Sequence, residues 1–227
     1  MHQYPLKKIL FSCLGIWGVL ILLQTSVVLA SNAVTFSQTI NDGTLSIDIV
    51  DNSGNTVSSP SATFGGLTFS FNSQTATGTL GTSSQRIRVY NPTGTNTWTA
   101  GIAATGGPTA LWTSGSDTYD FNDSHSDGTD DADTDTVGGR LTVDPSVGTV
   151  AGVPDNTTCS PTTGITKGSS SAFREIASAV SSITLLSGGA SATPYCRWDL
   201  TGVSLSQVIP PSQATGTYNL SFTVTIA

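Results

Sequence analysis

Histidine, glutamate and basic residues are scarce in this chain of 227 residues. Eight Lys and Arg stand against fifteen Asp and Glu, which gives a formal net charge of −7. After residue 30 the only histidine is His125 and the only glutamate is Glu175. General acid–base and nucleophilic catalysis rely heavily on these two side chains, so we predict that the protein is not an enzyme. The basic residues form no cluster beyond Arg86 and Arg88, which argues against a nucleic-acid partner.

Long apolar runs are absent except at the N-terminus. Lys7 and Lys8 precede the apolar run Ile9–Leu23, and Val28-Leu29-Ala30 then offers the small residues that a signal peptidase reads. A run of about 15 residues is short for a membrane span of about 20, although an uncleaved anchor is the alternative. We predict a signal peptide over residues 1–30, an extracellular or cell-surface location, and no permanent membrane span after cleavage.

Cysteine is equally rare, with three residues in the whole chain. Cys13 lies within the apolar run and would leave with the signal peptide. The other two, Cys159 and Cys196, form an even pair in a chain that we predict to be exported, and the alternative is two free thiols. Outside the cell such a pair is usually oxidised. We therefore predict one disulfide between Cys159 and Cys196.

Alternation of apolar and polar residues is the dominant pattern of the remaining chain. This period of two is typical of half-buried β-strands, and turns rich in Gly, Pro, Asn and Ser separate the runs. Helical spacing occurs once, and predicts a short helix over residues 171–180. We expect an all-β, antiparallel β-sandwich or jelly-roll-like single domain over residues 31–227, with long loops near 123–136 and 153–170. The predicted strands cover residues 45–50, 67–71, 87–89, 98–104 and 218–226.

The last strand and the tryptophans are the best candidates for the core. From Tyr218 to Ile226 every second residue is apolar, which predicts a strand central to the sandwich. Trp98, Trp112 and Trp198 lie in or beside alternating runs, where a large aromatic side chain fills a core. Trp112 is flanked by Gly-rich turns, so it is the best candidate of the three for exposure.

Acidic residues are concentrated in one segment, since eight of the fifteen lie between Asp117 and Asp135. Short acidic and amide side chains at alternate positions, mixed with Gly, Ser and Thr, suit calcium, which takes six to eight oxygen ligands from irregular loops. The alternative is a solvated acidic loop. We predict that this segment binds Ca²⁺, without an EF-hand, and that its ligands come from Asp120, Asn122, Asp123, Asp127, Asp131, Asp133 and Asp135.

Several segments resemble the WxL domain, a β-rich module of bacterial surface proteins. Gly43-Thr44-Leu45-Ser46-Ile47-Asp48 is similar to the start of that domain, Trp98-Thr99-Ala100 to its first Trp-x-Leu strand, and Gly216-Thr217-Tyr218 to the Gly-x-Tyr that precedes its last strand. A literal Trp-x-Leu is present at Trp198-Asp199-Leu200. The resemblance implies a β-rich fold and non-covalent attachment to peptidoglycan, with Trp98, Trp198, Leu200 and Tyr218 as the motif residues.

Three functions agree with these observations. The first is an exported, non-enzymatic cell-surface protein that associates non-covalently with the cell wall or with other surface proteins. The second is a self-assembling structural subunit of a surface layer, pilus or filament, which needs complementary edges. The third is a carbohydrate-binding module, which needs a coplanar row of exposed aromatic residues. No LPxTG-type motif precedes Ala227, so we expect any retention on the cell to be non-covalent.

Overall fold

The structure, a computed structural model, describes residues 35–227 except 124–137, 154–158, 160–162 and 176–178. Within these residues the regular elements are strands and one 3₁₀ turn, η1 (Pro145–Val147), which confirms the all-β prediction. The strands are β1 (Ser46–Val50), β2 (Gln74–Leu80), β3 (Arg86–Asn91), β4 (Trp98–Ala104), β5 (Trp112–Ser114), β6 (Asp117–Tyr119), β7 (Arg140–Asp144), β8 (Thr149–Gly152), β9 (Ile165–Lys167), β10 (Ser171–Ala172), β11 (Ile183–Gly188), β12 (Cys196–Thr201), β13 (Val203–Ile209) and β14 (Phe222–Ile226).

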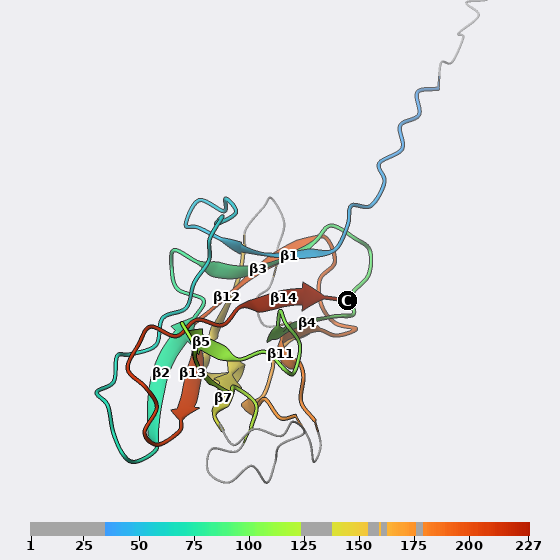
Figure 1. The fold of residues 1–227 in the computed structure, drawn as a ribbon. Helices are drawn as coiled ribbons and strands as arrows, with labels where there is room; N and C mark the ends of the chain where they lie inside the picture. Colours follow the sequence, from blue (N-terminus) through green and yellow to red (C-terminus); the bar gives the residue numbers. More distant parts are fainter. Residues whose placement is uncertain (1–34, 124–137, 154–158, 160–162, 176–178) are drawn as a thin grey trace, which may run out of the picture. The chain divides into compact units, whose positions relative to one another are not determined.

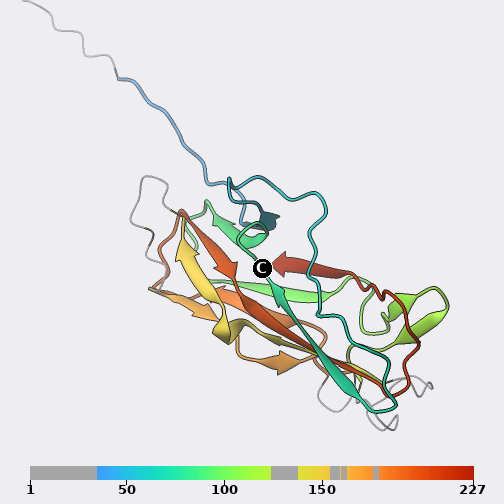
Figure 2. The same cartoon turned by 90° about the vertical axis from the view of Figure 1, so that its left-hand side faces the viewer.

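The strands form three four-stranded sheets and one hairpin, and every pairing is antiparallel. The sheet orders are β1-β3-β12-β8, β10-β7-β13-β2 and β14-β4-β11-β9, with β5-β6 as the hairpin. Figure 1 shows these elements, and Figure 2 shows them turned by 90°. The predicted β-sandwich-like domain is confirmed, and it is built from Asn41–Ala227.

The first two sheets are two halves of one bent layer. Three strands of one sheet continue along the chain into three strands of the other, as β2 to β3, β7 to β8 and β12 to β13, and their order across the two sheets is the same. Glycines stand at the bend: Gly81 and Gly202 have φ of +79° and +72°, and the Gly202 N–H donates to the Gly81 carbonyl at 2.7 Å. A side chain on Gly81 would meet the Leu200 carbonyl at 2.9 Å. Glycine is therefore required where the strands turn from one half into the other.

The third sheet packs on this bent layer through large aromatic side chains. Trp98 of β4 and Trp198 of β12 have ring centroids 5.5 Å apart, and they are 3% and 0% exposed. Phe121, Phe173 and Phe222 form a second cluster with centroid distances of 5.1 to 5.6 Å. The predicted core role of the tryptophans is confirmed, including that of Trp112, which is 8% exposed and so is not the surface residue that its flanking turns suggested.

Two predicted elements are wrong. Residues 67–71 form no strand, and Leu67, Phe69 and Phe71 remain 45%, 45% and 80% exposed. The helix predicted over 171–180 is also wrong, because Ser171–Ala172 pairs with β7 as a strand and Arg174 makes a β-bridge with Val180. Phe173, one of the apolar residues that predicted the helix, packs instead against Phe121 and Phe222.

The C-terminal strand is at an edge of its sheet, and its apolar side chains pack against the core while remaining only partly buried, so it belongs to the core less centrally than predicted. Within the described chain β14 pairs with β4 alone. Phe222, Val224 and Ile226 are half-buried on one side, while Thr223 and Thr225 are exposed, so the alternation itself was read correctly. Of the two predicted long loops, the second contains β9.

The predicted signal peptide, residues 1–30, lies outside the described residues. In the part of the chain that the structure describes, no helix is long and apolar enough to cross a membrane.

Candidate functional site

The Trp-x-Leu residues belong to the core. Trp198 and Leu200 are both fully buried on β12, a central strand, and the ring of Trp98 packs at a tilt against Trp198 from the opposite sheet. Tyr218 is half-buried, and its hydroxyl accepts a hydrogen bond from Gln213 Nε2 at 2.7 Å and donates to the Ala214 carbonyl at 2.9 Å. The structure therefore brings Trp98 and Trp198 together as packing residues and leaves Tyr218 apart from them.

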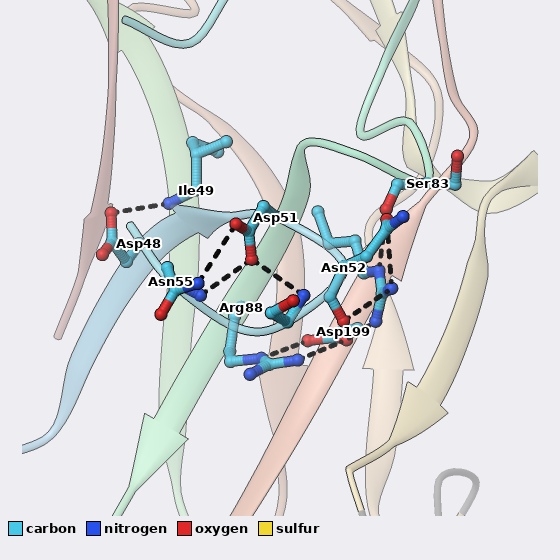
Figure 3. A network of polar contacts seen from close by, with 10 residues as sticks. Asp48, Ile49, Asp51, Asn52, Asn55, Ser83, Arg88 and Asp199 are labelled. Carbon is cyan, nitrogen blue, oxygen red and sulfur yellow. Dashed lines mark hydrogen bonds and ion pairs between the residues drawn. The ribbon is translucent and has the colours of Figure 1, made fainter. Parts of the chain in front are cut away.

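A buried ion pair joins β3 to β12 (Figure 3). Arg88 and Asp199 face each other in the strand register and are each 5% exposed. The guanidinium donates from Nε to Oδ1 at 2.6 Å and from Nη2 to Oδ2 at 2.8 Å, and Arg86 Nη1 donates to Oδ2 at 3.1 Å. The hydrogen bonds to Asp199 raise the pKa of Arg88 further above its usual value, so this residue stays charged.

The turn after β1 covers this ion pair. Asp51 Oδ1 accepts hydrogen bonds from the N–H groups of Ser53 and Asn55 at 2.8 and 2.9 Å, and Figure 3 shows the turn closed around it. The hydrogen bond from the Asn55 backbone is the main cause that lowers the pKa of Asp51. A side chain on Gly54 would meet Arg88 Nη1 at 2.5 Å, so the turn rests on the guanidinium. Arg88, Asp199 and Asp51 therefore find their partners within the fold, and we interpret all three as structural residues.

The predicted disulfide joins Cys159 and Cys196, with their Cα atoms 5.7 Å apart, and that prediction is confirmed. Cys196 is the first residue of β12 and is 1% exposed. The bond fastens the segment after β8 to the central strand, and the Val153 N–H reinforces this link by donating to the Arg197 carbonyl at 2.9 Å.

The predicted calcium ligands divide into two groups. Asp127, Asp131, Asp133 and Asp135 lie outside the described residues. Asp120, Asn122 and Asp123 are 3%, 2% and 0% exposed, so the start of the acidic segment belongs to the folded body and not to a solvated loop. Asn122 Nδ2 donates to the Pro108 carbonyl at 2.8 Å. No group of three or more His, Cys, Asp or Glu suited to a metal occurs among the described residues, and calcium binding stays a prediction.

A groove of about 1420 Å³ opens in the described chain, and its lining mixes apolar and polar surface in similar amounts. Its walls come from β1 and β14 on one side and from β2, β7 and β13 on the other, with the irregular segment of residues 60–70 along it. Leu67 and Phe69 line it and are each 45% exposed. Among the described lining residues, Asp48 is the only Asp, Glu, Lys or Arg. Such a groove suits an uncharged occupant that offers both apolar and polar groups.

One polar arrangement lies in the lining of the groove. Trp112 Nε1 donates to Gln207 Oε1 at 3.0 Å, and Gln207 Nε2 donates to the Val208 carbonyl at 2.8 Å and the Asp120 carbonyl at 3.3 Å. Gln207 is 1% exposed, so these bonds satisfy a buried amide. Tyr119 stacks on Trp112 with ring centroids 5.9 Å apart, and burial is the main cause that raises the pKa of Tyr119.

An unpaired strand edge borders the groove. Thr99 and Ala227 exchange backbone hydrogen bonds at 2.7 and 3.0 Å, and the Thr105 N–H donates to the Ser221 carbonyl at 2.9 Å. The register of β14 on β4 then directs the backbone groups of Phe222, Val224 and Ile226 away from β4. No strand of the described chain pairs with this side of β14. The sequence analysis missed both the groove and the free edge, because neither is a property of one segment.

Comparison with known proteins gives no relative for this chain: no protein-family model, no curated protein and no solved structure matches it.

Proposed function

We propose that this chain is an exported, non-enzymatic cell-surface protein that binds an extended apolar segment of another surface protein in its groove. The groove is the observation that carries the proposal. Exposed apolar surface of this kind is costly in an isolated protein and is typical of interaction sites. Retention at the surface would then be non-covalent, through protein contacts more than through the wall polymer.

Two observations favour a polypeptide over a saccharide as the occupant. Sugars bind on flat, exposed aromatic platforms, and Trp98, Trp112 and Trp198 are all buried. The exposed pair Phe69 and Phe71 has its rings at 86°, so the two side chains offer no coplanar surface. By contrast, a free strand edge beside an apolar groove is the arrangement that binds an extended peptide, because the edge supplies backbone hydrogen bonds and the groove accepts side chains.

Cell fractionation tests this function with a groove variant and a control in the same segment. Leu67→Asp/Phe69→Asp places two charges in the groove at half-exposed positions outside any strand. Phe71→Asp changes the same segment at an exposed position that does not line the groove. We expect the groove variant to lower the cell-bound fraction of the exported protein about tenfold or more. Phe71→Asp should leave this fraction unchanged. Equal retention of the groove variant and the wild type would contradict the proposal.

We also propose, from the sequence, that the acidic segment binds Ca²⁺ and thereby stabilises the folded domain. Millimolar calcium added to metal-free protein should raise the melting temperature. Asp131→Asn/Asp133→Asn should abolish that rise, and the absence of any shift in the wild type would return the segment to the solvated alternative.

A further inference from the structure

The segment Thr35–Ile40, called here the N-terminal arm, carries two exposed large apolar side chains. Phe36 and Ile40 are 92% and 89% exposed, and the arm forms no strand pairing. Phe36, Gln38 and Ile40 alternate with Thr35, Ser37 and Thr39, so an extended arm presents both large apolar side chains on one face. It contains no Gly, no Pro and no charge, and its Thr, Phe and Ile favour strands.

We propose that the groove of one molecule binds the N-terminal arm of a second copy, as an added strand beside β14. This rests on the proposed function, for which it names the partner. The free edge of β14 offers the backbone groups of Phe222 and Val224, and the side chains of these two residues line the groove. A strand added there extends the sheet and places Phe36 and Ile40 among apolar side chains, as in other cases of strand addition.

Length and charge agree with this occupant. Six extended residues span about 20 Å, which is close to the length of the five-residue strand β14. The arm is uncharged, so it brings no charge of its own into a groove whose described lining has Asp48 as its one charged residue. Burial of Phe36 and Ile40 would remove the two most exposed large apolar side chains of the described chain from water.

Arm and groove are different surfaces of one chain, so each contact leaves one arm and one groove free. Such a heterologous contact joins molecules head to tail and does not stop at two unless the rotation closes a ring. The predicted alternative function, a structural subunit of a surface polymer, has this property.

Sedimentation of the purified mature protein over a range of concentrations tests the proposal. The arm variant Phe36→Asp/Ile40→Asp charges the apolar face, and Thr35→Asp/Thr39→Asp adds the same charge to the opposite face as a matched control. We expect the wild type and the control to form a series of oligomers, and the arm variant to weaken association at least about 100-fold. Equal melting temperatures for the three proteins would show that the change lies in association.

A mixing experiment separates the two halves of the contact. The arm variant keeps its groove, and Leu67→Asp/Phe69→Asp keeps its arm, so a mixture should form heterodimers and nothing larger. A monomeric wild type, or an arm variant that assembles like the wild type, would overturn the proposal. A further contradicting result would be a monomeric wild type together with an arm variant that melts at a lower temperature than the wild type. The arm would then occupy the groove of its own molecule. If the proposal fails in one of these ways but the groove variant still shows a lower cell-bound fraction than the wild type, the proposed function stands and the partner is a different protein.

Discussion

The two central strands β3 and β12 differ from the edge strand β2, although all three belong to one bent layer. Around β12, Trp198 and Leu200 are fully buried, Cys196 is held by the disulfide, and Asp199 is paired with Arg88. Beside β2, by contrast, an irregular segment with half-exposed Leu67 and Phe69 runs along an open groove. The layer is therefore buried around β12, whereas beside β2 it borders an open groove.

This difference predicts that substitutions in the two regions affect different properties, namely stability and association. Around β12 the charged side chains are paired and the apolar side chains are buried within the chain. Substitutions there should therefore lower the free energy of unfolding. The groove end keeps apolar side chains in contact with solvent, so substitutions there should cost association and little stability.

The largest expected effect on this comparison comes from Trp198→Ala. Removal of a fully buried tryptophan that stacks on Trp98 should lower the free energy of unfolding by about 4 kcal/mol. Leu67→Ala, at a half-exposed position in the groove, should change it by less than about 0.5 kcal/mol. Urea denaturation of both variants measures the contrast. Similar losses at the two positions would show that the groove segment is part of the core.

The ion pair predicts a smaller contrast within β3. Arg88→Ala leaves the buried Asp199 with only the more exposed Arg86, and should cost about 3 kcal/mol. Arg86→Ala removes the outer partner and should cost about 1 kcal/mol or less. Denaturation at neutral pH compares the two. An equal cost would mean that the bidentate geometry of Arg88 contributes nothing beyond a single contact.

The disulfide should contribute on a similar scale. Cys159→Ser/Cys196→Ser opens a loop of about 36 residues, and its loss should lower the free energy of unfolding by about 3 kcal/mol with the β-sheet signal in circular dichroism retained. The variant should still assemble, because the groove is lined by other segments. Loss of assembly at a temperature where this variant is folded would show that the two ends of the layer are coupled.

The sequence predicted those strands whose alternation coincides with sheet pairing. Residues 45–50, 87–89 and 98–104 lie in or around β1, β3 and β4 as expected. Leu67, Phe69 and Phe71 alternate just as clearly and form no strand, because a pattern of side chains carries no information about a hydrogen-bonding neighbour. The same limit explains why the alternation in β14 predicts a contribution to the core but not the position of this strand at a sheet edge.

Of the candidate sites, the disulfide followed from cysteine count alone, whereas the groove and the Arg88–Asp199 pair did not. Arg88 and Asp199 are more than a hundred residues apart, and their pairing depends on the register of β12 on β3. One signal was available: Arg88 and Asp199 both lie within apolar strand sequences, Ile87-Arg88-Val89 and Trp198-Asp199-Leu200. Charged residues in such runs require a partner when the strand is central.

The smallest expected effect concerns Tyr119, which stacks on Trp112 in the lining of the groove. Burial raises its pKa above the ordinary value of 10.0, with a further contribution from Tyr218. The folded state therefore favours the protonated phenol, and this contribution to stability is fully present below pH 10. It declines at higher pH, because the unfolded chain ionises first. Tyr119→Phe should change stability little at pH 7 and should reduce the fall in melting temperature between pH 9.5 and about 11. An identical fall in both proteins would show that water reaches the phenol through the groove.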